Sequence, residues 1–289
     1  MSPVAVPNVS EGRDSAAIER FVEAVVAAGA RVVDVHSDTI HNRSVLTTVA
    51  PPDRLADAMA ALAAATTSID LTAQRGVHPR LGGLDVCPFV VDDAPAGDVV
   101  ALARAGGEAI AERARLPVYL YGYAATRREC EHLPDLRRGG LHGLVERSRR
   151  DLPPDLGPPV VDLRRGVVCV GARDVLVAFN VWLRCDAATA REIAATVRAD
   201  RALAGVRALG FDLGGGRAQV SMNLTEPART GVDAVHGAVA ALAADLGVRV
   251  LGTEIVGVPP ERFMPDPDAQ AARLLIKPGR SLEAALAGE

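Results

Sequence analysis

The alternation of apolar and polar residues predicts two successive series of strands and helices. In the first 122 residues, short apolar runs bounded by turn residues predict strands, and apolar positions about 3.6 residues apart predict helices. The predicted strands are 4–9, 31–35, 45–49, 84–91 and 117–121. The predicted helices are 14–28, 52–69 and 97–113. This order is close to βαββαβ, the split βαβ plan of ferredoxin-like folds.

The same order of elements returns after a polar stretch that is rich in proline and arginine. Residues 123–160 have a composition typical of a linker or a long functional loop. Beyond them, the predicted strands are 174–183, 206–212, 218–224 and 248–255, and the predicted helices are 187–202 and 227–246. The sequence therefore predicts an α/β (α+β) fold of two ferredoxin-like βαββαβ subdomains, 1–174 and 175–289, with a ligand cleft between their sheets.

Composition narrows the class of protein. Of the 289 residues, 49% are hydrophobic and only 3% aromatic, so small aliphatic side chains must fill the core. A net charge of −4 without a basic cluster argues against nucleic acid as a partner. No stretch resembles a signal peptide or reaches the roughly 20 apolar residues that span a bilayer. The four cysteines form no CxxC pair, as expected for buried thiols in a reducing cytosol. We therefore expect a cytoplasmic protein without a membrane partner.

The segment GVHPRLGGLDVCP, residues 76–88, is the strongest candidate for chemistry. Pro79 fixes its own φ and excludes His78 from the helical region, so the imidazole lies on a defined bend before a buried strand. A titratable side chain on a rigid turn suits a general acid/base catalyst. A loop histidine that is hydrogen-bonded to backbone is the structural alternative.

Polar side chains at three further places are candidates for ligand binding. Asn8, Ser10 and Glu11 end the first strand, where they face a ligand; alternatively, Ser10 or Asp14 caps the next helix. In the loop 36–44, Asn42 and Arg43 are candidate donors to substrate carboxylates. The two histidines of that loop have no spacing that defines a metal site, so we expect no metal. In the strand 218–224, Gln219 and Asn223 share one face with Ser221, which is solvated or lines a polar cavity.

Known catalytic motifs are missing from the sequence. The glycine-spaced stretch 157–173 contains neither a P-loop nor GxGxxG, and no serine lies in a GxSxG elbow.

Seven collinear blocks resemble the glutamate formiminotransferase family. VPNVSEGRD (6–14), DVHSDTIHNRSVLT (34–47), GVHPRLGGLDVCPF (76–89) and PVYLYG (117–122) are similar to the first half of these enzymes. GARDVLVAFNVWL (171–183), AQVSMNL (218–224) and EIVGVPP (254–260) are similar to the second half.

The resemblance implies that tetrahydrofolate binds between two α/β subdomains and exchanges a formimino group with N-formimino-L-glutamate, a one-carbon reaction of histidine degradation. It places the catalytic general acid/base on His78. The folate segment falls on Gly157–Gly166, of which Gly157, Pro158 and Gly166 match the family. Arg43 and Arg80 are candidates to hold substrate carboxylates. Asn42 is a further substrate-binding candidate, and Asn8, Gln219 and Asn223 are candidate walls of the folate site. The family also suggests a homodimer, and its chemistry needs no metal.

Several positions depart from the family pattern. The folate segment reads GPPVVDLRRGV, in which Asp162, Arg164 and Arg165 change the charge. Tyr123 stands where a glutamate is usual, and residues 138–144 lack the usual glutamates. Two alternatives therefore stay open: the same chemistry with another amino acid or amine, such as glycine, or a folate-binding protein without turnover.

Overall fold

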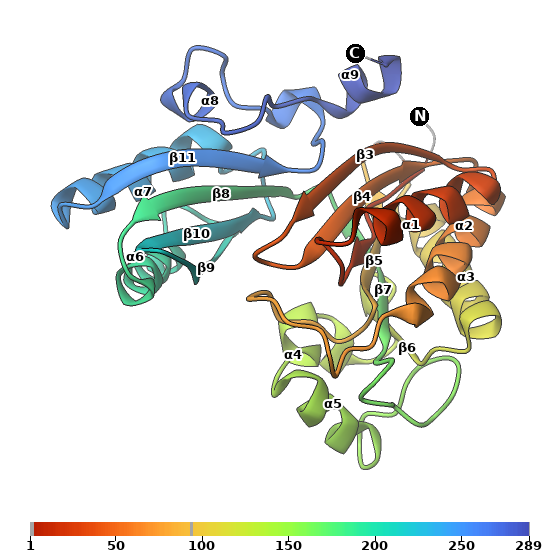
Figure 1. The fold of residues 1–289 in the computed structure, drawn as a ribbon. Helices are drawn as coiled ribbons and strands as arrows, with labels where there is room; N and C mark the ends of the chain where they lie inside the picture. The colour runs from red at the N-terminus through yellow and green to blue at the C-terminus, as the bar shows by residue number, and fades with distance from the viewer. Residues whose placement is uncertain (1–2, 93–94, 289) are drawn as a thin grey trace. The chain divides into compact units, whose positions relative to one another are not determined.

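The computed structural model describes residues 3–92 and 95–288. The chain divides into two compact units, Met1–Asp174 (unit 1) and Val175–Glu289 (unit 2). Each unit has one sheet with its own hydrophobic core (Figure 1). We describe each unit by itself.

Unit 1 contains a mixed sheet in the order β3-β4-(β1, β2)-β5-β7-β6. Its strands are β1 (Val4–Ala5), β2 (Asn8–Val9), β3 (Arg31–Asp38), β4 (Arg43–Val49), β5 (Leu84–Val91), β6 (Val118–Gly122) and β7 (Val168–Asp174). Pro7 has no N–H to donate to a ladder, and it interrupts the first strand, whose two pieces both pair antiparallel with β4 and β5. β7 runs parallel to both β5 and β6. With the helices between them, β1/β2, β3, β4 and β5 form the predicted ferredoxin-like arrangement, and β7 and β6 extend it.

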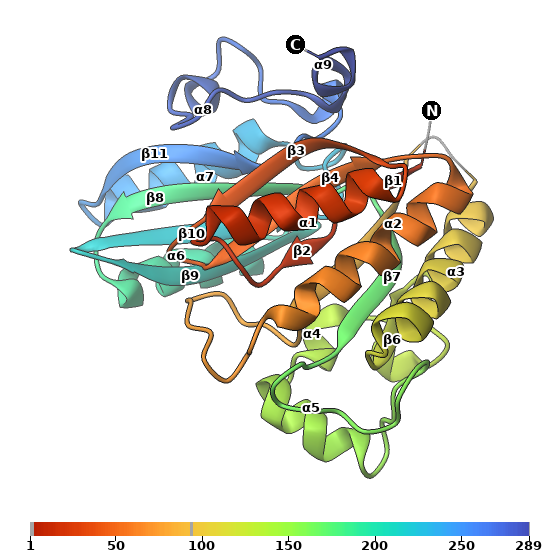
Figure 2. The ribbon, with the colours of Figure 1, turned by 45° about the vertical axis from the view of Figure 1, so that its right-hand side comes forward.

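Three helices cover one face of this sheet (Figure 2): α1 (Ser15–Ala27), α2 (Pro52–Ala65) and α3 (Ala96–Ala114). α1 begins at Asp14, whose carboxylate accepts the N–H of Ala17 at 3.0 Å, and the chain leaves it through Gly29 at φ 86°. α2 ends at Ala65 and continues only as a 3₁₀ turn, Thr66–Ser68, so the predicted helix 52–69 is too long by one turn.

The other face of the sheet, at its β5-β7-β6 end, is covered by the segment that we predicted as a linker or loop. This segment forms a 3₁₀ turn (Arg128–Cys130), α4 (Leu133–Leu136) and α5 (Gly140–Ser148), which we call the helical cover, residues 128–148. Its apolar side chains pack with Tyr119, Tyr121 and Cys169 of the sheet; they include Cys130, Leu136, Leu144 and Val145. The linker prediction was wrong because a few well-spaced apolar residues suffice to bury short helices whose other faces are rich in arginine.

Unit 2 follows the ferredoxin-like plan closely. Its strands are β8 (Val177–Arg184), β9 (Val206–Gly214), β10 (Arg217–Leu224) and β11 (Arg249–Val256), and they pair antiparallel in the order β11-β8-β10-β9. α6 (Ala187–Ala199) and α7 (Val232–Asp245) pack on one face. Beyond β11 lie a 3₁₀ turn (Glu261–Phe263), α8 (Gln270–Arg273) and α9 (Leu282–Ala287).

The boundaries of several elements differ from prediction. The predicted strand 174–183 spans the end of β7 and most of β8, two strands that belong to the sheets of different units. α7 begins only at Val232, because residues 225–230 form turns after Leu224. The two-unit mixed fold itself is confirmed. None of the helices in the described ranges is both long and apolar enough to cross a membrane.

Candidate active site

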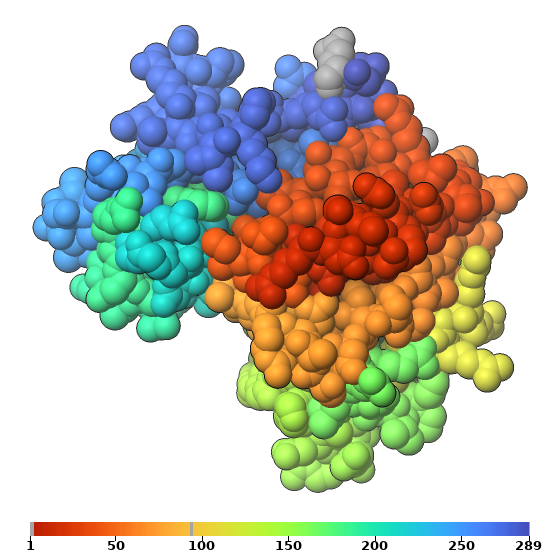
Figure 3. Space-filling view, in the orientation of Figure 1, coloured from red at the N-terminus to blue at the C-terminus, as the bar shows by residue number. Residues whose placement is uncertain are grey.

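His78 lies on the surface turn between α2 and β5, and this turn is fixed to the loop between β3 and β4. Figure 3 shows the orange segment after α2 at the surface of unit 1. The guanidinium of Arg80 donates to the carbonyl oxygens of His41 at 2.9 Å and of Asn42 and His78 at 3.3 Å each. A side chain at Gly76 could not fit, since its Cβ would lie 2.3 Å from the His41 carbonyl oxygen. The structure thus gives Arg80 a role in holding the turn.

Asn42 joins the same two segments through all its amide atoms. Its backbone is left-handed, with φ 49°. Its Oδ1 accepts the N–H of Gly12 at 2.9 Å, and its Nδ2 donates to the Arg75 carbonyl at 3.0 Å and to the Gln74 side-chain oxygen. The side chain is buried. Since these contacts use both amide protons, the geometry favours Asn42 as a positioning residue.

A β-bulge directs the carboxylate of Asp85 toward this turn. On β5, Val86 pairs with Asn8 and Leu84 pairs with Val9, so Asp85 is the extra residue between them. The side chain is fully buried, and its Oδ1 accepts the N–H of Leu81 at 2.7 Å. The Arg137 and Arg43 guanidinium groups hold the pKa of this carboxyl well below its usual value, even though burial by itself raises it.

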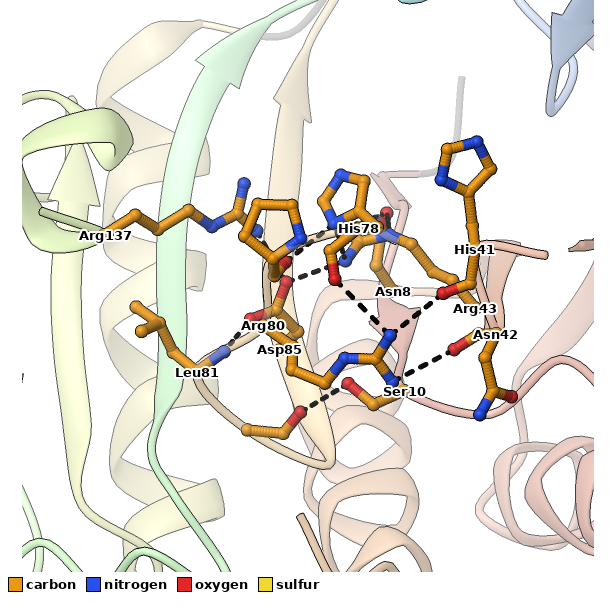
Figure 4. Close-up of polar contacts among 12 residues, drawn as sticks. Asn8, Ser10, His41, Asn42, Arg43, His78, Arg80, Leu81, Asp85 and Arg137 are labelled. Atoms are coloured by element: carbon orange, nitrogen blue, oxygen red, sulfur yellow. Dashed lines mark hydrogen bonds and ion pairs between the residues drawn. The ribbon is translucent and has the colours of Figure 1, made fainter. Parts of the chain in front are cut away.

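Two arginines share the second oxygen of Asp85 (Figure 4). Arg43 Nη1 lies 2.8 Å from Asp85 Oδ2, and Arg137 Nη2 lies 2.5 Å from the same atom. Arg137 directly follows α4 and reaches Asp85 from the helical cover, whereas Arg43 begins β4. Asn8 fixes the other edge of Arg43, because its Oδ1 accepts from Nε at 3.0 Å and from Nη2 at 2.7 Å. Burial lowers the pKa of Arg43 to about 10, so it stays charged near neutral pH.

His78 is held as a neutral base beside this cluster. Its Nδ1 lies 2.7 Å from the carbonyl oxygen of Pro79 and 3.2 Å from Arg43 Nη1. The carbonyl can only accept, so we assign the proton to Nδ1 and the lone pair to Nε2. Burial, followed by the charges of Arg43 and Arg137, lowers the pKa of His78 well below 6.5. The imidazole of His41 lies beside it, edge to face, with ring centroids 6.0 Å apart.

The polar residues that end the first strand are also bound within the protein. Ser10 donates to the Gly82 carbonyl at 2.7 Å, and Glu11 accepts the N–H groups of Gly12, Arg13 and Asp14 at 2.8–3.0 Å. Asp14, the other cap that we considered, begins α1. Both Ser10 and Glu11 therefore have structural roles at the start of the helix and beside the His78 turn.

The predicted folate segment adjoins the His78 turn at one end. Gly166 pairs with Gly82 as an isolated bridge, and Val167 N–H donates to the Leu81 carbonyl at 2.9 Å. Gly157 and Gly166 have φ values of 79° and 69°, and a Cβ would lie 2.4 Å from the Leu116 oxygen and 2.0 Å from the Leu81 oxygen, respectively. Pro158 is half-buried. The backbone alone thus requires both glycines, and folate contact by this segment stays a prediction.

Gln219 and Asn223 lie in unit 2, on the face of its sheet opposite α6 and α7. Gln219 is fully buried, whereas Asn223 is exposed. The neighbouring strands bring Asn180 and Glu254 to the same face, where Asn180 Nδ2 donates to Glu254 Oε2 at 3.2 Å. The register places Trp182, Phe211 and Leu209 on this face as well, so it is mixed in polarity, and folate contact by Gln219 and Asn223 stays a prediction.

The cysteines are free thiols, as predicted. Cys87, Cys130 and Cys169 are buried, and Cys185 is half-buried. Within the described parts of the chain, no three His, Cys, Asp or Glu side chains converge as a group that could hold a metal ion.

Comparison with known proteins identifies the family. The model of the formiminotransferase domain, N-terminal subdomain, matches residues 3–173, and that of the formiminotransferase domain matches residues 178–277. The chain is 38% identical over 270 residues to glutamate formimidoyltransferase of Thermoplasma acidophilum, covering 90% of this chain and 89% of the relative. It is 34% identical to the enzyme of that name in Streptococcus pyogenes serotype M1, over 90% of both chains.

A longer relative matches over part of its length only. Formimidoyltransferase-cyclodeaminase of Gallus gallus is 35% identical over 94% of this chain, which spans 52% of that protein. The chain therefore belongs to the formiminotransferase family. It is a transferase of one-carbon groups, and its chemistry is formimino transfer in folate metabolism.

Two residues of the cluster escaped the sequence analysis. Asp85 stands within the apolar run LDVCPFVV, and a carboxylate in a buried strand requires cationic partners, so it could have been found by that rule. Arg137 lies in the stretch that we predicted as a linker, among several other arginines. No local signal in the sequence distinguishes it from them.

Proposed function

We propose that this protein transfers a formimino group between N-formimino-L-glutamate and N5 of tetrahydrofolate, with His78 as the general acid/base. The observation that carries the proposal is the neutral imidazole of His78 on a turn fixed by Arg80 and Asn42. Exchange of a group between two amines requires a proton to leave the attacking nitrogen and another to reach the leaving one. Nε2 can accept the first and return it to the second.

The remaining side chains of the site set the position and the proton affinity of His78. Asp85 and Asn8 fix Arg43 beside Nδ1, and the Pro79 carbonyl fixes the tautomer. Gly157, Pro158 and Gly166, with Asn8, Gln219 and Asn223, are the residues that we assign to tetrahydrofolate. Tetrahydrofolate supplies the nucleophilic amine. The protein supplies orientation and the proton transfer.

Formation of 5-formiminotetrahydrofolate from tetrahydrofolate and N-formimino-L-glutamate tests this function directly. In His78→Gln we expect kcat to fall about 10²–10⁴-fold, the range for loss of a general acid/base, with little change in the affinity for tetrahydrofolate. His132→Gln is the matched control, because His132 is exposed and makes no capping bond at α4. A normal kcat in His78→Gln would overturn the catalytic assignment.

The divergent segment Gly157–Gly166 favours one second candidate, the same transfer with a different amine. Asp162, Arg164 and Arg165 change the charge of this segment, and Arg164 pairs with Asp70 at 2.8 Å. A panel of formimino amino acids, including formiminoglycine, identifies the amine. Folate binding without turnover on the whole panel would instead support a binding protein. The homodimer and the cytoplasmic location are both still predictions. Analytical ultracentrifugation tests the first, and cell fractionation tests the second.

A further inference from the structure

The buried cluster beside His78 carries more positive than negative charge. Arg43 and Arg137 have side chains that are 12% and 19% exposed, and both pair with the single, fully buried carboxylate of Asp85. The neutral imidazole of His78 does not contribute a charge. One positive charge is therefore uncompensated in a poorly solvated place, which favours an anionic ligand.

The two arginines differ in the donors that they retain. Arg43 is occupied by Asp85 at Nη1 and by Asn8 through Nε and Nη2. Among the described residues, Arg137 makes one side-chain hydrogen bond, from Nη2 to Asp85. Its Nε is buried without a partner, and no described residue bonds to its Nη1. A buried guanidinium with unused donors is suited to bind a carboxylate.

A chain of three contacts links Arg137 to the His78 ring. Asp85 Oδ2 and Arg43 Nη1 link the Arg137 guanidinium to His78 Nδ1 through contacts of 2.5, 2.8 and 3.2 Å. In Figure 4, one terminal nitrogen of Arg137 contacts Asp85, and the other points to the same side as the His78 ring. A ligand carboxylate at this nitrogen would place a nearby amine beside the base.

We propose that Arg137 binds the α-carboxylate of the amino-acid substrate, an inference that rests on the proposed formimino transfer. In N-formimino-L-glutamate the reacting nitrogen and the α-carboxylate are joined by one carbon. Arg137 therefore holds the group nearest to the bond that breaks. The glutamyl tail of tetrahydrofolate also carries carboxylates, but an aromatic ring and an amide separate it from N5. Arg43, which we also predicted to bind a substrate carboxylate, is already paired with Asp85 and Asn8.

The test compares Arg137→Gln and Arg137→Lys with Arg138→Gln. Arg138 is the adjacent arginine, its side chain is 77% exposed, and it pairs only with Asp135, three residues earlier. With N-formimino-L-glutamate we expect kcat/KM to fall about 10–100-fold in Arg137→Gln, as for loss of a hydrogen bond to a charged group, and less in Arg137→Lys. Arg138→Gln should match the unaltered protein.

The α-amide of the same substrate separates binding from a structural role. The unaltered protein should prefer the acid to the α-amide by about 10–100-fold, and Arg137→Gln should lose this preference, whereas an indirect effect would slow both substrates equally. Tetrahydropteroate, which lacks the glutamyl tail, distinguishes the two carboxylate sources. If the effect of Arg137→Gln persists with tetrahydropteroate, the amino acid is the ligand. If it vanishes, the tail is the ligand and the proposal is overturned.

The experiments also distinguish a failure of the Arg137 proposal from a failure of the proposed formimino transfer. If the unaltered protein transfers the group but Arg137→Gln keeps the preference for the acid, only the Arg137 proposal fails. If no transfer occurs at all, calorimetric titration with glutamate and with its α-amide shows whether Arg137 binds the α-carboxylate. Weaker binding of glutamate, but not of the amide, to Arg137→Gln supports the proposal, and equal binding to both proteins overturns it. Arg137→Lys, which keeps the charge next to Asp85, repeats the comparison should Arg137→Gln fold poorly.

Discussion

At the scale of single residues, the charges around His78 oppose one another. Arg43 and Arg137 disfavour the imidazolium, while Asp85 favours it, and burial adds to the effect of the arginines. The pKa of His78 is lowered, so its neutral, basic form persists well below pH 6.5.

The first prediction concerns the pH dependence of catalysis. The acidic limb of kcat/KM should lie below pH 6.5, because activity is lost only when the pH falls through the depressed pKa of His78. Arg137→Gln removes a positive neighbour and should move this limb to higher pH, whereas Asp85→Asn should move it lower. A pH series for the three proteins measures both shifts, and shifts in the same direction would refute the electrostatic account.

The lowered pKa of His78 also makes the stability of the fold depend on pH. In the pH window between its folded pKa and 6.5, the unfolded chain binds a proton that the folded chain does not, so the free energy of unfolding rises with pH there.

The second prediction concerns the buried carboxylate. Asp85→Asn leaves two guanidinium groups without a counter-charge, and we expect a loss of about 3–5 kcal/mol in the free energy of unfolding, as for a broken buried ion pair. Denaturant titration at pH 7 measures this loss. Asp70→Asn is the control, since its pair with Arg164 is exposed and should matter little. An equal effect of the two substitutions would contradict the role of Asp85.

At the scale of elements, the segment 157–166 is joined to the His78 turn by close backbone contact. Gly166→Ala should destabilise unit 1 through both its left-handed backbone and the collision of a Cβ with the Leu81 carbonyl. Gly140→Ala is the matched control, because Gly140 has a similar φ of 64° and nothing within 4 Å of a Cβ. Comparison of their unfolding midpoints isolates the collision. If Gly166→Ala loses no more stability than Gly140→Ala, the contact is not important.

The sequence predicted the regular elements better than it predicted the irregular ones. Period-2 and period-3.6 patterns identified most of the strands and the main helices, because each of those elements buries an apolar face. They missed β7, which lies between β5 and β6 in the sheet of unit 1. The helical cover escaped, since α4 has only four residues and its burial depends on Tyr119, Tyr121 and Cys169, which lie outside the segment. The His78 turn was found from its proline and glycines. Its partner Arg137 was not, because pairing across 52 residues leaves no local pattern.

At the scale of the whole molecule, the two units share no sheet, and each has its own apolar core. We therefore predict that residues 175–289 fold by themselves, since their four strands and two packed helices complete a ferredoxin-like unit. Cooperative thermal unfolding and dispersed amide resonances of that fragment would confirm this, and a broad, non-cooperative transition would contradict it.

The position of Arg137 on the helical cover has a consequence for the whole of unit 1. Arg137 depresses the proton affinity of His78 only while the helical cover rests against β5, β6 and β7. If the cover moves away, Asp85 is left to Arg43 alone, and the imidazole takes up a proton more readily. The protonation state of the His78 ring therefore depends on whether the helical cover packs against the sheet.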